Sequence, residues 1–421
     1  MLKILRHKLV GQSFTYVAFD ALNKGIPFLL LPILTRYLET NEYGIVAMFS
    51  TLVSILMVFT GLSVHGAVNV NFFRMEKNEF PAFVANAFLI LFTSSALVFV
   101  IILTLGDFFA EFLELPEVWV LVAVIVAASQ FITTINLVLW QAEQKPKYFG
   151  WYEFCLTLFN FGMSLFLVVH QEMGWSGRLL ASSGVTIAFA CLSLFIIYKR
   201  GYIRFKFNLN HIKNGLNFGV PLIPHALSGW ITTSMDRLIL TTLIGLGATG
   251  LYSAGYQVGL IVGILAAACS RAFSPYLFEK LKDADEALKR TIVKISYLYF
   301  LGITLFAVSL GLLSYKLLPL FLGLRFASSA DVVIWVALGY AFSGMYLVVV
   351  QFIFYEKKTH LLSMVSISGA LIHAGLCYVL VKTYGVVGAA YATTLSYLIT
   401  FLMTWILSAK TYKMPWFSAF H

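Results

Sequence analysis

The chain has 421 residues, of which 60% are hydrophobic and 11% are charged, whereas a soluble domain carries about 25% charged residues. This composition excludes an ordinary soluble domain and predicts an all-α polytopic membrane protein. The net charge of +10 is concentrated in alternate polar loops, which is the positive-inside pattern of a membrane protein and argues against nucleic-acid binding.

Twelve apolar stretches, separated by short polar turns, account for most of the chain. Each has about the 20 residues that a helix needs to cross a hydrocarbon core of about 30 Å. Most lysines and arginines lie inside when both termini are cytoplasmic, so we expect that orientation. The first six predicted spans form an amino-terminal lobe (1–207) and the last six a carboxy-terminal lobe (208–421), at residues 10–35, 43–70, 83–106, 118–139, 149–170, 179–198, 215–244, 251–275, 292–314, 331–354, 361–382 and 386–408.

The first predicted span contains two charged residues, Asp20 and Lys24, about halfway across the membrane. A charge at the bilayer centre costs about 2.5–3.5 kcal/mol, so such residues usually face the interior of a bundle or a water-filled cavity. Asp20 and Lys24 are four residues apart and lie on one helix face, where they can pair with each other. Asn23 adds a polar neighbour, and we expect Pro27 and Pro32 to bend the outer half of the span.

Further polar residues occur along the second, fifth, seventh, eighth and eleventh spans. The adjacent Asp236 and Arg237 point about 100° apart on a helix, so they cannot face the same partner. Two readings stay open for these two residues: an ion pair that fixes helix packing, or a gate. Arg74 and Arg271, near inner span ends, either anchor at the interface or contact substrate. The remaining polar residues of the set are His65, Asn69, Glu153, His225 and His373, and a satisfied packing role is the simpler reading of each histidine.

The chain shows signs of an internal duplication. The segment ILTRYLETNEYG (33–44) aligns without gaps with ILTTLIGLGATG (239–250). Six spans in each half give both halves the same orientation, so we expect a pseudo-twofold axis along the membrane normal. Two other resemblances recur at similar offsets: Glu143 with Lys145 against Glu356 with Lys358, and Gly174 with Gly177 against Gly385 with Gly388.

Four other features lead to predictions. The polar link Lys199–Asn214 is interpreted as a cytoplasmic connector, with a surface helix that turns Phe205 and Phe207 toward lipid as one option. Gly255, Gly259 and Gly263 recur every fourth residue, which favours close helix packing. The four cysteines match no zinc pattern and lie inside apolar runs, so we expect no metal site. The chain has neither a P-loop nor an HExxH motif, and we expect no enzymatic activity.

The segment from Gly219 to Tyr256, GVPLIPHALSGWITTSMDRLILTTLIGLGATGLYSAGY, together with PILTRYLETNEYG (32–44), resembles the polysaccharide transport family of the MOP (MATE-like) exporter superfamily. Within that family the chain looks like the O-antigen, or lipid-linked oligosaccharide, flippases. The sharpest motif is GxPLxP, followed by the Asp236–Arg237 pair and the Gly250-Leu251-Tyr252 turn.

The resemblance implies a bacterial inner-membrane protein that carries an undecaprenyl-diphosphate-linked repeat unit from the cytoplasmic to the periplasmic leaflet by alternating access. It implies no cofactor, and it leaves open whether protons, sodium ions or the membrane potential drive transport. The expected partners are the lipid-linked glycan and the bilayer, with a polysaccharide polymerase and a chain-length regulator as candidates.

On this reading, the charged and polar residues divide into two groups. The first would line the cavity, with Lys24, Arg271 and Arg74 holding the diphosphate and Asp20 orienting Lys24 or serving ion coupling. The second would gate or stabilise the lobe interface. The cavity set is Asp20, Lys24, Asn69, Arg74, Glu153 and Arg271, and the interface set is His225, Asp236 and Arg237.

Two other functions fit the same sequence features. A cation-coupled small-molecule exporter of the MATE type would give drug efflux that depends on Asp20 or Glu153, without a defect in surface glycan. A scaffold for glycan assembly would bind the polymerase and move no lipid between leaflets.

Overall fold

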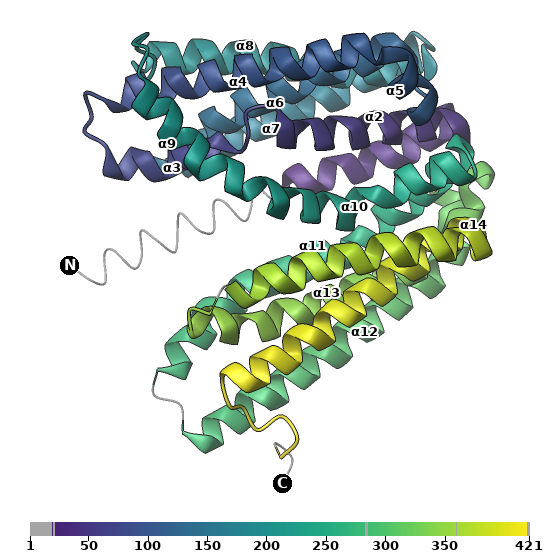
Figure 1. Ribbon diagram of the computed structural model, residues 1–421. Helices are drawn as coiled ribbons and strands as arrows, with labels where there is room; N and C mark the ends of the chain where they lie inside the picture. The colour runs from purple at the N-terminus through teal and green to yellow at the C-terminus, as the bar shows by residue number, and fades with distance from the viewer. Residues whose placement is uncertain (1–18, 20–21, 283–284, 359, 419–421) are drawn as a thin grey trace. The chain divides into compact units, whose positions relative to one another are not determined.

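The computed structural model describes residues 19, 22–282, 285–358 and 360–418, and the regular secondary structure in these ranges is helical (Figure 1). The chain divides into two compact units: unit 1 comprises Met1–Leu38 and Ile45–Leu227, and unit 2 comprises Glu39–Gly44 and Ser228–His421. This division by contacts falls inside a helix, about twenty residues after the predicted boundary at 207/208. Nine helical stretches in the described ranges are long and apolar enough to cross a membrane: Thr40–Phe59, Phe80–Thr104, Glu117–Ala142, Pro146–His170, Gly174–Lys199, Leu246–Leu281, Glu286–Leu322, Leu324–Tyr355 and Leu362–Thr411.

The predicted second span is two helices. Helix α2 (Thr40–Phe59) ends before a turn, and α3 (Val64–Arg74) continues in a new direction. The turn is made by Gly61, Leu62 and Ser63, whose φ angles of 77°, 49° and 57° are all left-handed. Three residues in succession with left-handed backbone break the i to i−4 hydrogen bonds of the helix. Hydropathy alone does not reveal such a break.

The predicted seventh span is also divided. Helix α9 (Leu209–Gly219) is followed by a 3₁₀ turn, η2 (Val220–Leu222), and by α10 (Ile223–Leu243). Pro221 lies in that turn, where its missing backbone N–H and its ring disfavour a continuous α-helix. Helix α10 carries Asp236 and Arg237 and is not among the nine apolar stretches found in the described ranges.

Unit 1 is built around α6 (Glu117–Ala142), which packs against α3, α4 and α8. Its core contains Phe83, Phe131 and Leu139, each almost fully buried. The other elements of this unit are α4 (Phe80–Thr104), α5 (Gly106–Leu113), α7 (Pro146–Leu165) with its π-helical extension η1 (Phe166–His170), and α8 (Gly174–Lys199).

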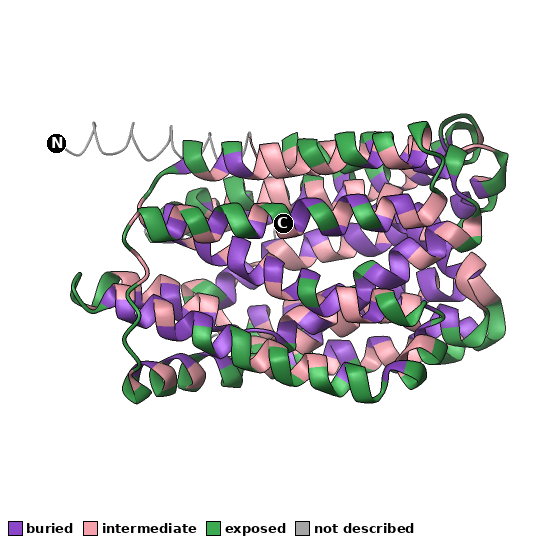
Figure 2. Cartoon of the chain, turned by 90° about the horizontal axis from the view of Figure 1, so that it is seen from above, coloured by how far each residue is buried: buried purple, intermediate pink, exposed green. Residues whose placement is uncertain are grey.

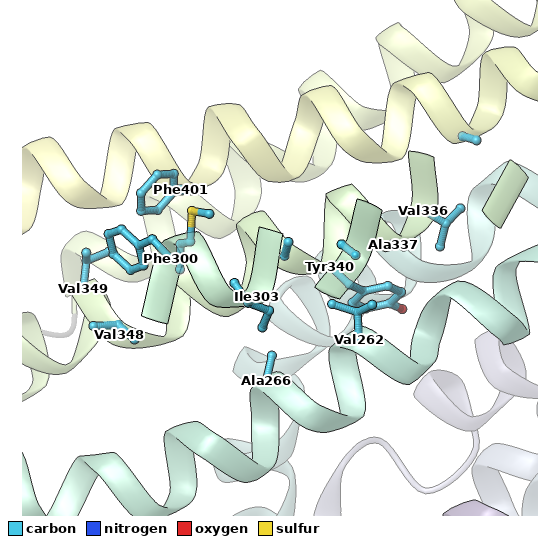
Figure 3. Close-up of a cluster of buried hydrophobic side chains, with 14 of the residues drawn as sticks. Val262, Ala266, Phe300, Ile303, Val336, Ala337, Tyr340, Val348, Val349 and Phe401 are labelled. Atoms are coloured by element: carbon cyan, nitrogen blue, oxygen red, sulfur yellow. The ribbon is translucent and has the colours of Figure 1, made fainter. Parts of the chain in front are cut away.

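Unit 2 is built around α13 (Ala330–Tyr355), which packs against α11 (Leu246–Leu281), α12 (Glu286–Leu322) and α14 (His360–Thr411). The short 3₁₀ segment η3 (Leu324–Ser329) precedes α13. Figure 3 shows apolar side chains of these helices meeting in one cluster, with Val262 of α11 beside Tyr340 of α13 and Ala266 of α11 near Ile303 of α12. Helix α14 contains the eleventh and twelfth predicted spans, divided at Gly385 by a φ of 62°.

The predicted close packing along the eighth span is confirmed. A Cβ placed on Gly255 would lie 2.7 Å from the carbonyl oxygen of Ser329, and one on Gly259 would lie 2.7 Å from Val336. One on Gly263 would lie 2.5 Å from the ring of Tyr340. The absence of side chains at these three positions therefore allows α11 to approach α13.

The polar link before α9 is extended rather than helical until Leu209. Its backbone is fixed to α4: the Arg204 N–H donates to the carbonyl of Pro81 (3.2 Å), and Asn86 donates to the carbonyl of Lys206 (2.8 Å). Phe205 and Phe207 are 89% and 67% exposed. The two phenylalanines thus project from a fixed strand of chain, not from a surface helix.

Exposed apolar side chains are abundant on the outer faces of the helices. Figure 2 shows buried residues on faces turned toward neighbouring helices and exposed residues on the opposite faces. Leu97 in α4 and Leu298 and Leu301 in α12 are all more than half exposed. Lipid tails, which are as apolar as leucine, are the natural surroundings of such faces.

The three short sequence resemblances fall on equivalent turns of the backbone. Gln144 and Lys357 both have left-handed φ angles, of 56° and 58°, and Gly174 and Gly385 have φ angles of 58° and 62°. Since a left-handed conformation is uncommon, its recurrence at aligned positions supports repetition of local structure. The same backbone hydrogen bonds also recur: Lys145 to Trp140 with Lys358 to Ile353, and Leu38 to Leu34 with Ile244 to Leu240.

The first aligned segment also touches its counterpart, and the start of α2 and the start of α11 both belong to unit 2. A Cβ on Gly44 would lie 2.0 Å from the carbonyl oxygen of Leu246, and one on Gly250 would lie 2.0 Å from that of Thr40. The alignment pairs Thr40 with Leu246 and Gly44 with Gly250, so the contacts are reciprocal. A local twofold relation between the two segments requires this reciprocity.

Candidate functional site

In unit 1, the first helix (22–37) and α7 are joined by a polar contact. The amide of Asn23 donates to the Glu153 carboxylate over 3.2 Å. A Cβ on Gly150 would lie 2.2 Å from the ring of Phe19, so the two segments approach closely. Lys24, next to Asn23, is half-buried. The structure therefore brings Glu153 close to the first span, whereas Asp20 lies outside the described residues.

Helix α3 carries the predicted residues of the second span. Asn69 and His65 are half-buried, and Arg74 is exposed in the last turn. Sequence reasoning missed a partly buried contact on this helix: Asn71 donates to Asn214 of α9 over 2.9 Å. This amide pair connects α3 to α9. Arg74, three residues further along α3, lies at the surface of unit 1.

A second missed cluster surrounds Arg178 near the start of α8. Its guanidinium donates to the side chains of Asn160 (2.6 Å) and Ser164 (2.7 Å), both on α7. Buried charges in membrane helices need such partners. The cluster connects α7 to α8 at the end of α7, directly before the π-helical turn η1 begins at Phe166.

A third cluster lies at the carboxy-terminal end of α6, where Glu143 follows the last residue of the helix. Glu143 forms an ion pair with Arg200 (2.5 Å) and another with Lys145 (3.0 Å), and it accepts a hydrogen bond from Tyr202. The Arg200 guanidinium lies over the ring of Trp140, 5.5 Å from its centroid. Burial alone would raise the pKa of Glu143, but the bonds from Tyr202, Arg200 and Lys145 outweigh it and lower the pKa. Burial and the bond to Glu143 raise the pKa of Tyr202 to about 12.

Replacing Glu143 with glutamine is expected to reduce stability by about 1–3 kcal/mol at pH 7, because hydrogen bonds to a charged group are lost. A lowered carboxyl pKa stabilises the fold above the usual value of about 4.3, and this contribution disappears as the pH falls through the lower folded-state value. Thermal unfolding in detergent between pH 3 and 8 should therefore show a weaker acid-side decline in Glu143→Gln than in the wild type.

The matched control is Glu286→Gln, which removes an exposed ion pair with Lys289 (2.9 Å) and should change stability by less than about 1 kcal/mol. Equal effects of the two substitutions would show that the Glu143 cluster does not stabilise the fold. Tyr202 adds a test on the alkaline side. Its raised pKa stabilises the fold below about pH 10, and that contribution is lost between about pH 10 and 12.

Unit 2 holds the most completely buried polar cluster among the described residues. Asp236 of α10 and His373 of α14 are both 0% exposed, and Oδ1 of Asp236 lies 2.7 Å from Nε2 of His373. The other carboxylate oxygen accepts hydrogen bonds from Tyr252 and from Thr393 (3.2 Å). His373 is thus a buried packing residue with polar partners, as expected of the histidines, and one of those partners is Asp236.

The other predicted residues of unit 2, and His225 of unit 1, lie nearer the surface. Arg237 is half-buried, donates to the carbonyl of Thr233 (2.8 Å), and lies over the ring of Tyr256 at 4.6 Å from its centroid. Its direction differs from that of Asp236, as the helix geometry predicts. His225 on α10 and Arg271 on α11 are exposed. Their roles in gating and substrate binding stay predictions.

Each unit has a surface hollow. In unit 1, Arg36, Tyr37, Phe166 and His170 are among the residues around a hollow of about 590 Å³. In unit 2, a hollow of about 430 Å³ lies between α11, α12 and α13 and has an almost wholly apolar lining. The first offers basic and aromatic groups, and the second suits a hydrocarbon.

The chemistry offered by these clusters is that of binding and charge compensation. Within the described part of the chain, no group of three or more histidine, cysteine, aspartate or glutamate side chains is placed to hold a metal ion. Asp236 and Glu153 stood out in the sequence because of their charge. Asn71 and Thr393 did not, since hydroxyls and amides are common in membrane helices.

The amino-acid sequence is similar to those of known proteins. Residues 9–281 match the family described as polysaccharide biosynthesis protein. A Haemophilus influenzae protein of the Lsg locus is 24% identical over 372 residues, which cover 87% of this chain and 90% of that protein. A Shigella flexneri protein assigned as an O-antigen transporter is 28% identical over 190 residues, covering 42% of this chain and 45% of that protein.

Solved structures of two kinds of transporter share the fold. The lipid II flippase MurJ, in an inward closed conformation, has a TM-score of 0.72 at 16% identity, covering 96% of this chain and 88% of the other. A mutant form of the Vibrio cholerae MATE transporter VcmN has a TM-score of 0.62 at 13% identity, covering 97% of each chain. These relatives are transporters and flippases rather than enzymes.

Proposed function

Since the chain belongs to the polysaccharide biosynthesis protein family and has the fold of the MOP exporter superfamily, we propose that it flips an undecaprenyl-diphosphate-linked oligosaccharide. The repeat unit, of O-antigen or a related surface polysaccharide, would move from the cytoplasmic to the periplasmic leaflet by alternating access. Family membership is the observation that carries this proposal. Polymerase and chain-length regulator are the proposed partners, and the bacterial inner membrane is the proposed location.

The charged residues of unit 1 support this substrate class. A diphosphate carries roughly two negative charges, which a basic side chain can neutralise when water is lost. Lys24 is half-buried beside the Asn23–Glu153 contact, and we propose that it binds the diphosphate. Outward movement of an anion across an inside-negative membrane is favourable by about 2.3 kcal/mol per charge per 100 mV, so ATP would not be required.

Replacing Lys24 with alanine is expected to reduce surface glycan at least tenfold without lowering the amount of protein in the membrane. Lys24→Arg, which keeps the charge, should retain part of the activity, and Lys316→Ala should behave as the wild type because Lys316 is an exposed lysine of α12. Glycan at the surface and protein in the membrane would be measured by blotting. Normal glycan in Lys24→Ala would remove Lys24 from the mechanism.

Deletion of the whole gene tests the function itself. Complete lipid-linked repeat units should then accumulate on the cytoplasmic side and be recovered by lipid extraction. Drug sensitivity without such accumulation would instead favour an exporter of small molecules.

The proposed orientation has its own test in reporter fusions. A phosphatase joined after Leu115 should be active, because the loop after α5 is expected in the periplasm. One joined after Lys206 should be silent, because the basic link before α9 is expected in the cytoplasm. The opposite pattern would reverse the orientation of the chain and the proposed direction of transport.

A further inference from the structure

The surface hollow of unit 1 lies where two helical segments of that unit end. The first helix ends at Tyr37 and the π-helical turn η1 ends at His170, and both residues line the hollow. Its volume is about 590 Å³. Ligand sites in proteins commonly have volumes of about 300–1,000 Å³, so the hollow has room for a polar headgroup and the first part of a hydrocarbon chain.

The lining of the hollow changes from apolar to basic along both segments. Ile33 of the first helix and Leu165 of α7 are apolar, and each lies about one turn before the end of its segment. The basic residues, Arg36 and His170, lie in the last turns. Arg36 is displaced from Ile33 by about 4.5 Å along the helix axis. In the expected orientation both segments run outward, so the basic rim faces the periplasm and the apolar part faces the bilayer.

The π-helical turn η1 shapes one side of the hollow. The backbone N–H of Gln171 donates to the carbonyl of Phe166, five residues earlier, over 3.0 Å. Such turns are rare and occur frequently at functional sites. The rings of Phe166 and His170 lie against each other, with their centroids 5.4 Å apart. This contact positions the imidazole beside the apolar part of the lining.

The charge of the lining indicates which kind of headgroup fits. Of the seven described residues that line the hollow, none has a carboxylate, and Glu172, the acidic residue nearest to His170 in the sequence, is exposed outside the lining. Arg36 is exposed, and an arginine is always charged and presents N–H groups in a planar fork that matches a phosphate. The His170 ring adds at least one N–H donor. The lining therefore suits a phosphate and disfavours a cation.

The apolar part of the lining indicates that the phosphate is attached to a hydrocarbon. Phe166 is 49% exposed and Tyr37 is 51% exposed, and both belong to the hollow. Lipid chains are the natural surroundings of apolar surface on membrane helices. A free anion would occupy only the basic rim, whereas a lipid phosphate covers the rim and the apolar part together.

We propose that the hollow binds the phosphate group of a lipid in the outer leaflet. Arg36 and His170 donate hydrogen bonds to the phosphate oxygens, and the apolar side chains cover the first carbons of the lipid. A membrane phospholipid and a polyprenyl diphosphate both have this chemistry. The binding itself does not rest on the proposed transport function, whereas a polyprenyl diphosphate in the hollow would be the transported headgroup after it has crossed the membrane.

Binding is measured by native mass spectrometry of the purified full-length protein in detergent, titrated separately with phosphatidylglycerol, undecaprenyl diphosphate and diacylglycerol. Diacylglycerol has the chains of phosphatidylglycerol without the phosphate. The wild type should bind at least one of the two phosphate lipids at least tenfold more tightly than diacylglycerol. Arg36→Gln/His170→Gln should lose at least tenfold of that affinity. The control Arg325→Gln, which removes an exposed arginine of η3, should behave as the wild type.

A further variant tests the hollow without changing its charge. Val169→Trp fills part of the apolar lining and should weaken lipid binding at least tenfold, although both basic residues are kept. Inorganic pyrophosphate, which has the charge but no chain, should bind to the wild type at least tenfold more weakly than the preferred phosphate lipid. Thermal unfolding of each variant shows whether it is folded.

The outcomes separate the site from general properties of the membrane interface. Equal binding of diacylglycerol and the phosphate lipids, or an equal loss in Arg325→Gln, would overturn the proposal. Pyrophosphate bound as tightly as the lipids would overturn the role of the hydrocarbon. Preference for phosphatidylglycerol would assign the hollow to a membrane phospholipid, and preference for undecaprenyl diphosphate would assign it to the transported headgroup. A protein that moves no glycan would overturn the flippase function and leave these binding results unchanged.

Discussion

The variant Asp236→Ala is expected to lose about 3–5 kcal/mol of folding free energy, because removing one member of a buried ion pair leaves the other uncompensated. His373, fully buried on α14, would lose its acceptor, and so would the hydroxyl of Tyr252. Thr393 still has the carbonyl of Ala389 as an alternative acceptor (3.1 Å). The effect is measured by thermal or denaturant unfolding in detergent, together with the amount of protein that reaches the membrane.

The graded variant Asp236→Asn separates shape from charge. It keeps an acceptor oxygen for Tyr252 and should cost less than Asp236→Ala. The control Asp331→Ala removes an exposed carboxylate from α13 and should change stability by less than about 0.5 kcal/mol. If the Asp236→Ala variant were as stable as the Asp331→Ala control, the cluster would contribute nothing to the folding free energy.

Gly44→Ala and Gly250→Ala are each expected to destabilise the protein by about 1–3 kcal/mol, the cost of inserting a methyl group into a closed contact. Each new Cβ would lie 2.0 Å from a backbone carbonyl oxygen of the other segment, and backbone cannot rotate away as a side chain can. The two segments must therefore separate.

The double variant gives the sharper test. Once one alanine has pushed the segments apart, the second meets less resistance, so the double variant should cost less than the sum of the two single ones. Gly302→Ala in α12 is the control, since no atom lies within 4 Å of its added Cβ, and it should gain up to about 1 kcal/mol from helix propensity. Strictly additive losses would show that the two glycines do not meet in one contact.

Much of the helical layout could be predicted from hydropathy, because lipid-facing and buried helix faces are both apolar. The breaks inside the second and seventh spans could not, since they depend on backbone conformation at Gly61–Ser63 and around Pro221. The short repeat at Gly44 and Gly250 was visible in the sequence. Only the structure shows that the two glycines make a reciprocal contact, in which each lies against the backbone of the other segment.

The candidate sites were predictable where a charge stands out in an apolar run. Asp236 and Glu153 were found in this way, and both have polar partners in the structure. The partners themselves could not be found, because they are distant in sequence and have ordinary hydroxyl, amide or imidazole groups. Arg74, His225 and Arg271 are exposed in the structure, and charge alone does not distinguish a residue that binds substrate from one that anchors at the interface.

The buried pairing of α10 with α14 has a consequence for biogenesis. Thr393 follows Asp236 by 157 residues, so at about 5–20 residues per second a ribosome needs roughly 8–30 s to make the rest of the cluster. Until then the Asp236 carboxylate has Tyr252 as a donor but lacks its partners His373 and Thr393. We therefore expect α10 to stay at the translocon, or beside a chaperone, until the last helices emerge.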